Sequence, residues 1–319
     1  MRATFPRREF LRRAAGCAAW SAGAAAALAA PSAPPALTII DTHVHFYDPS
    51  RPQGVPWPSP DDKVLYHTTL PKDYQAQTQS RPVAGVVVVE ASPLVEDNQW
   101  ILDLAAREKL IAGFVGQLPV GEDGFRAHLE RCAANPIFRG LRLRPAPAKA
   151  RWEDARWLDD LKLLAARDLS LGLVGGKETL DLAARLAERF PELCIVIDHL
   201  AGVRIDGKAP AADWLDAMRF GAKRPNIFCK VSGLVEGTGL RGGQAPRDTT
   251  FYKPTLDALW EIFGEDRLVY GSNWPVCEHF APLESVQRIA LEYFTAKGAG
   301  PLRKVFSENA RRAYKWVKR

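Results

Sequence analysis

Eight short runs rich in apolar and β-branched residues recur along the chain, and stretches with helical periodicity separate them. Parallel strands can be joined only by a crossover of a dozen or more residues, so this spacing predicts a parallel sheet. The runs are apolar along their length, which requires cover on both faces of the sheet. We therefore predict an α/β fold, a (β/α)8 TIM barrel in a single domain over 37–319, with a doubly wound open sheet as the alternative. The predicted strands are 37–41, 85–90, 110–117, 138–144, 170–174, 193–198, 226–231 and 267–272.

The segments between these strands carry apolar residues at positions i, i+3 and i+4, the pattern of a helix with one buried face. The clearest are 98–109, 124–134, 155–168, 177–189 and 255–263. One connection, 46–81, is long and rich in proline, and it contains Trp57, Tyr66 and His67. Connections of that length in compact domains are usually functional, so we expect a loop or lid over the site.

The first thirty residues have the pattern of an export signal rather than of a folded element. Arg7 and Arg8 open a twin-arginine motif, an alanine-rich stretch follows, and small residues at 27–29 suit cleavage. We therefore predict a cleavable signal over 1–30, recognised by the twin-arginine export machinery, and a periplasmic location for the mature protein. The stretch has too few large apolar residues for a stable membrane anchor.

The charge of the chain gives no reason to expect nucleic acid as a partner. The formal net charge is +6, and five arginines and one glutamate of the predicted signal account for +4 of it. The remainder is therefore near +2, without a basic run that carries interleaved aromatic residues. We expect a small-molecule substrate instead, and the sequence allows a homo-oligomer.

An H-x-H motif, His43 and His45, stands at the end of the first predicted strand. Residues i and i+2 of a strand point to the same side, so both imidazoles can converge at the mouth of a barrel. Neutral imidazole nitrogen suits a divalent metal such as zinc or manganese, and two surface histidines are the alternative. His199 follows the sixth predicted strand and could bind the metal or polarise a carbonyl group, with Asp198 orienting an imidazole.

Three cationic side chains lie on the later predicted strands. Arg142 and Arg144 share one side of the fourth strand, where a guanidinium group can bind a substrate carboxylate or an oxyanion. A salt bridge to an acidic neighbour at the barrel rim is the alternative for either arginine. Lys230 stands inside the seventh strand, and a lysine is rarely buried without a partner.

Six segments in collinear order resemble the amidohydrolase-2 branch of the amidohydrolase superfamily, and within it the 2-pyrone-4,6-dicarboxylate lactonases and the sugar-acid lactonases. They cover nearly the whole chain after the predicted signal. The segments are D-T-H-V-H-F-Y-D at 41–48, F-R-G-L-R at 138–142, V-I-D-H-L-A-G at 196–202, C-K-V-S-G-L at 229–234, Y-G-S-N-W-P-V at 270–276 and E-N-A-R-R-A-Y at 308–314. The resemblance implies a TIM-barrel hydrolase, and it implies that Lys230 faces the site.

The eighth-strand segment departs from the family pattern. Relatives usually carry aspartate where this chain has Asn273, and that aspartate is a metal ligand or the base that activates water. An amide cannot accept a proton at neutral pH, so another group must serve if the reaction is retained. We favour Glu90 for this role. The alternative interpretation of Glu90 is a salt bridge to Arg142 or Lys230. A histidine acting as base without a metal is a second possibility, and a ligand-binding protein with little catalysis is a third.

Taken together, these features predict a hydrolase that acts on a lactone or a related ester- or amide-like carbonyl of a small carboxylate or sugar acid, with a divalent metal. A non-oxidative decarboxylase of the same branch and a periplasmic ligand-binding protein are the alternatives. Trp274 is expected to wall the pocket, unless it only packs in the core. The predicted catalytic residues are His43, His45, Glu90 and His199, the predicted substrate-binding residues are Arg142, Arg144, Lys230, Asn273 and Trp274, and the predicted metal ligands are His43, His45 and His199.

Overall fold

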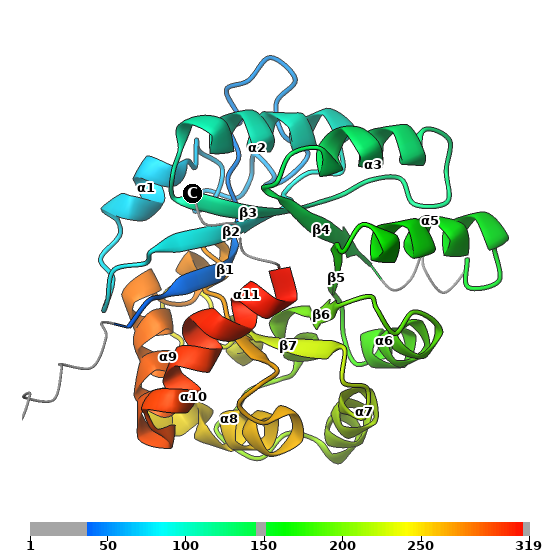
Figure 1. Cartoon of the computed structure of the whole chain (residues 1–319). Helices are drawn as coiled ribbons and strands as arrows, with labels where there is room; N and C mark the ends of the chain where they lie inside the picture. The colour runs from blue at the N-terminus through cyan, green and yellow to red at the C-terminus, as the bar shows by residue number, and fades with distance from the viewer. Residues whose placement is uncertain (1–36, 145–150, 315–319) are drawn as a thin grey trace, which may run out of the picture. The chain divides into compact units, whose positions relative to one another are not determined.

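The computed structural model describes residues 37–144 and 151–314, so the predicted signal over 1–30 lies outside the described residues. Eight parallel strands pair in chain order in one sheet (Figure 1). A bridge between Val44 and Trp274 joins the first strand to the segment after the last, which nearly closes the sheet into a barrel. This order confirms the predicted parallel α/β barrel and rules out the open-sheet alternative. The strands are β1 (Ile40–Val44), β2 (Gly85–Val89), β3 (Ile111–Gly116), β4 (Phe138–Leu143), β5 (Ser170–Leu173), β6 (Ile195–Ile197), β7 (Ile227–Val231) and β8 (Leu268–Tyr270).

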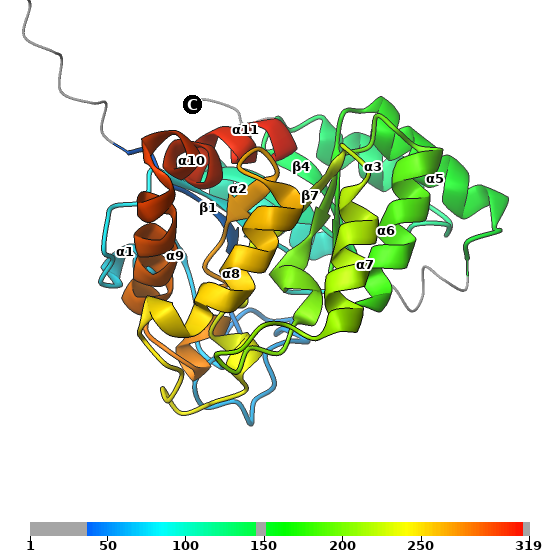
Figure 2. The ribbon, with the colours of Figure 1, turned by 90° about the horizontal axis from the view of Figure 1, so that it is seen from below.

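Helices surround the sheet and alternate with its strands (Figures 1 and 2). The α-helices are α1 (Pro71–Ala76), α2 (Val95–Arg107), α3 (Phe125–Ala133), α5 (Ala155–Ala166), α6 (Glu178–Arg189), α7 (Ala212–Ala222), α8 (Thr249–Phe263), α9 (Leu283–Lys297), α10 (Ala299–Arg303) and α11 (Asn309–Tyr314). Short 3-10 turns η1 (Asp198–Gly202), η2 (Glu236–Thr238) and η3 (Val276–His279) follow β6, β7 and β8, and a π-turn η4 (Lys304–Glu308) precedes α11. Among the described residues, no helix is both long and apolar enough to cross a bilayer.

Two boundaries differ from the sequence prediction for a clear physical reason. β1 begins and ends three residues later than predicted, because its polar residues are buried and hydrogen-bonded: Asp41 accepts from the Ser272 amide and from the Tyr74 hydroxyl. Helix α8 begins six residues earlier than predicted, at Thr249. The side chain of Asp248 caps that end by accepting from the Thr250 amide, and Pro254 is tolerated inside the helix.

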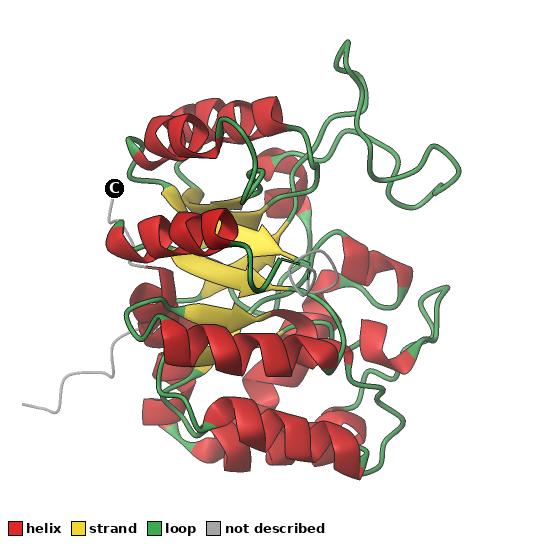
Figure 3. Cartoon of the chain, turned by 90° about the vertical axis from the view of Figure 1, so that its right-hand side faces the viewer, coloured by secondary structure: helices red, strands yellow, loops and turns green. Residues whose placement is uncertain are grey.

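The barrel is filled at one end and open at the other. Inward-facing residues such as Val87, Val196 and Val269 form a buried cluster with Ala310 and Tyr314 of α11. Each apolar side chain of that size contributes about 1.5–3 kcal/mol when fully buried. Helix α11 therefore packs against one end of the barrel, while the loops that follow the carboxyl ends of the strands extend from the other (Figures 2 and 3). Active sites of such barrels lie at this second end.

Candidate active site

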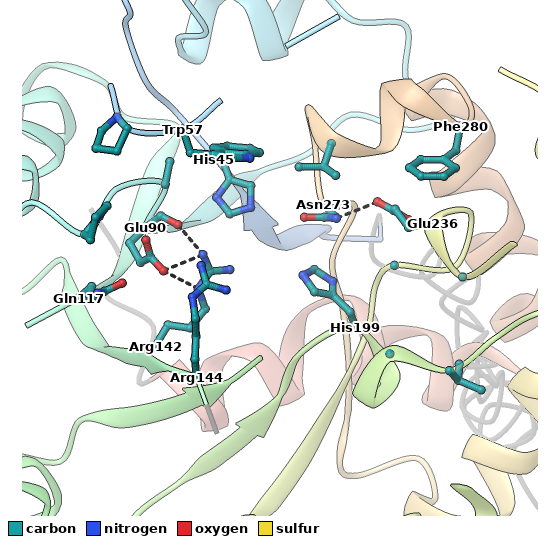
Figure 4. A pocket seen from close by; sticks show the side chains of 18 of the residues that line it. His45, Trp57, Glu90, Gln117, Arg142, Arg144, His199, Glu236, Asn273 and Phe280 are labelled. Atoms are coloured by element: carbon teal, nitrogen blue, oxygen red, sulfur yellow. Dashed lines mark hydrogen bonds and ion pairs between the residues drawn. The ribbon is translucent and has the colours of Figure 1, made fainter. Parts of the chain in front are cut away.

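A cavity of about 690 Å³ opens at the carboxyl ends of the strands. Segments that follow β1, β2, β3, β4, β6, β7 and β8 all contribute to its wall, although they are far apart in the sequence. Figure 4 shows ten of the residues that line it: His45, Trp57, Glu90, Gln117, Arg142, Arg144, His199, Glu236, Asn273 and Phe280. The cavity thus combines imidazole, guanidinium and carboxylate groups with two aromatic side chains.

The structure brings the three predicted imidazoles together. The ring centroid of His43 lies 5.0 Å from that of His45 and 4.3 Å from that of His199. His43 belongs to β1 and is fully buried, so it lies behind the cavity wall, whereas His45 and His199 line the cavity itself. The first and sixth strands therefore deliver their histidines to one place, as the H-x-H motif and the D-H-L segment predict.

The turn that carries His199 has an unusual backbone. His199, Leu200 and Ala201 all have left-handed φ angles, of 49°, 54° and 51°. Such angles cost about 1–2 kcal/mol per residue outside glycine, so the surrounding structure must hold the turn. The Trp214 indole donates to the Leu200 carbonyl at 2.9 Å. Gly233 makes room for the histidine, because a Cβ there would lie 2.8 Å from the Cβ of His199.

Lys230 and Asp198 both lie beside Nδ1 of His43. Nζ of Lys230 lies 2.8 Å from Asp198 Oδ1 and 3.1 Å from His43 Nδ1, and Asp198 Oδ1 lies 3.7 Å from the same nitrogen. Burial and then the charge of Lys230 hold the pKa of His43 well below its usual value, so the ring stays neutral. The buried Nε2 has no hydrogen-bond partner among the described residues.

The other two imidazoles are held in a different way. His45 donates from Nδ1 to the Val89 carbonyl at 2.9 Å, which leaves a lone pair on its Nε2. Nδ1 of His199 is hydrogen-bonded to the Ser232 hydroxyl at 2.9 Å. Burial lowers the pKa of His45 to about 3 and that of His199 to about 4, so both rings are neutral at physiological pH.

The predicted metal ligands His43, His45 and His199 lie together, but they are not arranged to hold a metal ion in this structure. Within 37–144 and 151–314, no group of three or more His, Cys, Asp or Glu side chains is so arranged. Asn273 offers an amide in place of a carboxylate.

Glu90 forms a salt bridge with Arg142, which is one of the alternatives to its predicted catalytic role. Nε and Nη2 of Arg142 lie 2.8 and 2.7 Å from the same carboxylate oxygen of Glu90, and Nη2 also donates to the Glu90 carbonyl. Both side chains are buried. Burial raises the pKa of Glu90, and the charge of Arg142 opposes that rise. Arg142 thus occupies one carboxylate oxygen of Glu90 and stabilises its ionised form, so the salt-bridge alternative is observed, and the catalytic role of Glu90 stays a prediction.

Arg144 differs from Arg142, its neighbour two residues before. It is exposed at the cavity wall, and among the described residues it forms no ion pair. Its guanidinium group is therefore available to an anionic or hydroxyl-rich ligand, as predicted.

Two predicted substrate-binding residues lie outside the cavity. Lys230 is buried beneath it, between Asp198 and His43. Trp274 is buried against Tyr74, with ring centroids 5.3 Å apart, and its Nε1 donates to Glu278. Neither lines the cavity. The core-packing interpretation of Trp274 is correct, because its indole finds both its apolar contacts and its acceptor away from the site.

A carboxylate that the sequence analysis missed, Glu236, lines the cavity in η2. Asn273 Nδ2 donates to Glu236 Oε1 at 2.8 Å, and Glu236 Oε2 is buried with no hydrogen-bond partner among the described residues. Burial raises the pKa of Glu236 to about 7. An acidic residue shortly after a barrel strand, here in L-V-E-G after β7, is the sequence signal that would have found it.

The long connection after β1 covers part of the cavity. It contains helix α1, although the sequence analysis treated it as a loop. Trp57 lines the cavity and meets the ring of His45 edge to face at a centroid distance of 5.6 Å. His279 of η3 is paired with Asp62 at 2.8 Å, which ties the connection to the turn after β8. The predicted contribution of this segment to the site is therefore confirmed for Trp57.

Comparison with known proteins places the chain in a family. The family model described as Amidohydrolase matches residues 40–316, so the chain belongs to the amidohydrolase family. Two curated relatives are L-fucono-1,5-lactonases. The protein of Burkholderia ambifaria is 32% identical over 244 residues, which is 74% of this chain and 80% of that protein. The protein of Burkholderia multivorans is 30% identical over 251 residues, which is 75% of this chain and 82% of that protein.

Solved structures agree with this assignment. An amidohydrolase from Burkholderia multivorans with bound zinc is 26% identical, covers 88% of this chain and all of its own, and superposes with a TM-score of 0.77. A probable 2-pyrone-4,6-dicarboxylic acid hydrolase from Acinetobacter baumannii is 16% identical and shares the fold, with a TM-score of 0.69 and coverage of 88% of this chain. The family and the zinc-bound neighbour suggest a divalent metal, whereas the described residues of this chain contain no group arranged to bind one.

Proposed function

We propose that the protein hydrolyses a lactone ring of a sugar acid or of a similar small carboxylate. The observation that carries this proposal is the cavity at the carboxyl ends of the strands, where neutral imidazoles face a guanidinium group and two carboxylates. Two relatives at least 30% identical are L-fucono-1,5-lactonases, which supports a sugar-acid lactone as the substrate class.

The dimensions and lining of the cavity suit such a substrate. Its volume of about 690 Å³ lies in the range of small-molecule sites, which is roughly 300–1,000 Å³. Arg144 and Gln117 offer donors for hydroxyl or carboxylate oxygens of the ligand. Trp57 and Phe280 offer apolar faces against which a ring can pack.

We assign to His199 the role of hydrogen-bond donor to the carbonyl oxygen of the lactone. When the Ser232 hydroxyl donates to Nδ1, Nε2 of His199 carries a hydrogen and can donate into the cavity. Water then adds to the carbonyl carbon, and the negative charge that develops on oxygen is stabilised by this donor and by the nearby guanidinium of Arg142. The ring carbon–oxygen bond breaks, the ring oxygen takes a proton, and a hydroxy acid leaves.

The proposal is tested by an assay of the mature protein with L-fucono-1,5-lactone and a panel of other aldonolactones, in which acid release is followed with a pH indicator. We expect turnover of at least one lactone, and a loss of about 100-fold or more in His199→Ala. His128→Ala, a half-buried histidine on α3 outside the cavity, is the matched control. Carbon dioxide release from a hydroxybenzoate instead would favour the decarboxylase. Binding of lactones without turnover would favour the ligand-binding protein.

We propose in addition that residues 1–30 direct the protein to the periplasm through the twin-arginine machinery. Arg7 and Arg8 support this through the motif that they open. Fractionation of cells that express Arg7→Lys, Arg8→Lys should show precursor retained in the cytoplasm, with Arg2→Lys as the matched control. Undiminished periplasmic protein in the double variant would contradict export by this route.

A further inference from the structure

The cavity contains a second carboxylate that the reaction outlined above does not use. Glu236 follows β7, and its Oε1 accepts from the side-chain amide of Asn273, which follows β8. The donor distance is 2.8 Å, and the interaction spans 37 residues of sequence. Oε2 of Glu236 is buried and has no hydrogen-bond partner among the described residues. An orphaned carboxylate oxygen beside a ligand cavity is unusual, because a buried polar atom is normally paired.

The surroundings of Glu236 leave its charge uncompensated. Tyr252 of α8 and Cys277 of η3 face it, and its charge contributes to the raised pKa of both. Arg241 lines the same cavity, but within the described part of the chain no arginine or lysine forms an ion pair with Glu236. The polar contacts that remain are neutral ones: the backbone amide of Glu236 itself and the side-chain amide of Asn273. A carboxylate held in this way keeps a high proton affinity, unlike one that is paired with a guanidinium group.

Contacts to β1 fix the backbone of Asn273 in the turn after β8. It has a left-handed φ of 61°, and its amide nitrogen donates to the His43 carbonyl at 2.9 Å. Its side-chain Nδ2 points at Glu236, as Figure 4 shows. The fixed amide therefore orients the carboxylate of Glu236 from the neighbouring turn.

We propose that Glu236, in the turn after β7, is the catalytic base of the lactonase reaction and that Asn273, in the turn after β8, positions it. The inference rests on the proposed lactone hydrolysis and names the proton acceptor that this reaction requires. Its geometric basis is the orphaned Oε2 beside the cavity and the amide bond that orients the group. The raised pKa of about 7 is consistent with a base that works near neutral pH.

The step balances as follows. Glu236 takes a proton from a water molecule while the water oxygen forms a bond to the lactone carbonyl carbon. The pair of electrons of the carbonyl double bond moves to the carbonyl oxygen. When that pair returns, the ring carbon–oxygen bond breaks and the ring oxygen accepts the proton from Glu236. The carboxylate is regenerated, and one water has been added to one lactone.

The decisive experiment compares three variants of the mature protein with the wild type on the lactone that the assay above identifies. Glu236→Gln keeps the shape and the Asn273 contact but cannot accept a proton, so we expect kcat to fall about 100- to 10,000-fold with KM changed only a few-fold. Glu278→Gln is the matched control, because Glu278 is a half-buried glutamate that accepts one hydrogen bond outside the cavity. Glu236→Gln, Asn273→Asp returns a carboxylate to the turn after β8, and we expect it to regain at least tenfold over Glu236→Gln.

The pH dependence of the wild type provides a test that no folding defect can obscure. We expect kcat/KM to fall as the pH decreases through about 7, because Glu236 must be ionised to act. A profile that stays flat between pH 5.5 and 8, or a Glu236→Gln variant with wild-type kcat, would overturn the assignment. Absence of regain in the folded double variant would also overturn it. A wild type that hydrolyses no lactone would instead refute the proposed function, so the two failures are distinguishable.

Discussion

Two walls of the cavity each carry a buried carboxylate, and they differ in the partner that the carboxylate has. On one wall, Glu90 accepts from two nitrogens of Arg142 at 2.7–2.8 Å. On the other wall, Glu236 accepts from the neutral amide of Asn273 at 2.8 Å. Figure 4 shows the two pairs on opposite sides of His45 and His199. The distances are nearly equal, so the difference lies in charge rather than in geometry.

That difference separates two roles. A guanidinium partner stabilises the ionised carboxylate and occupies its lone pairs, which favours a structural or anion-binding role for the pair. An amide partner orients the carboxylate without neutralising it, and burial then raises its proton affinity. The pKa of Glu236 reaches about 7 for this reason, whereas Arg142 opposes the rise for Glu90. The partner of a buried acid, and not its depth alone, therefore indicates whether it can exchange a proton.

The largest predicted effect is on the free energy of unfolding, when the charge of each carboxylate is removed by the isosteric change of glutamate to glutamine. Glu90→Gln leaves the buried guanidinium group of Arg142 without a counter-charge, so we expect a loss of about 3–5 kcal/mol in the free energy of unfolding. Glu236→Gln removes a charge that has no counter-charge and whose ionised form is disfavoured by folding, so we expect no loss and instead a gain in stability at pH 7.5. Urea unfolding of both variants at pH 7.5 measures the difference. Equal losses in the two variants would break the comparison.

A smaller effect is expected on substrate affinity. Arg144→Ala removes an exposed guanidinium group at the cavity wall, and charge-assisted hydrogen bonds contribute about 1.5–3 kcal/mol. We therefore expect KM for an anionic or hydroxyl-rich lactone to rise roughly ten- to a hundred-fold, with little change in kcat. Arg156→Ala, whose partner is the exposed Asp123 away from this cavity, is the matched control. An unchanged KM would show that the free arginine does not contact substrate.

A third effect concerns the pH dependence of stability. The pKa of Glu236 is raised from 4.5 to about 7 in the folded protein, so folded protein binds this proton more tightly than unfolded protein does. The contribution to stability is complete below about pH 4.5 and is lost as the pH rises through 7. The melting temperature of the wild type, relative to that of Glu236→Gln, should therefore fall between pH 5 and pH 8. A difference that is constant over this range would contradict the raised pKa.

The smallest expected effect is that of metal removal. Neither carboxylate belongs to a group that could hold a metal among the described residues. Activity after dialysis against a chelator should therefore stay within about twofold of the untreated protein. A large loss of activity, if added zinc or manganese reverses it, would support the metal ligands predicted from the sequence.

The architecture was predictable because it depends on local patterns. Strand spacing and apolar runs are visible in the sequence, and so is the position of a residue at the carboxyl end of a strand. His43, His45 and His199 were therefore brought together correctly. The end of β1 was misplaced because the polar residues Thr42 and His43 are buried there with partners from distant segments.

The partners of the polar groups were not predictable, because they join segments that are remote in the sequence. Arg142 reaches Glu90 across 52 residues, and Lys230 reaches His43 across 187. Glu236 was missed for the same reason, since its significance depends on the amide of Asn273 in another turn. Sequence patterns thus located the functional groups, whereas only the fold determined which nitrogen or oxygen of each is available.

The left-handed turn at His199 has a consequence for anyone who modifies this enzyme. Three successive residues occupy a region that only glycine visits without penalty, so Ala201→Gly would relax the backbone and, we expect, stabilise the fold. The same relaxation would loosen the segment that aims the imidazole. Selection for heat resistance alone would therefore favour a change that blunts turnover, and a screen should score both properties at this position.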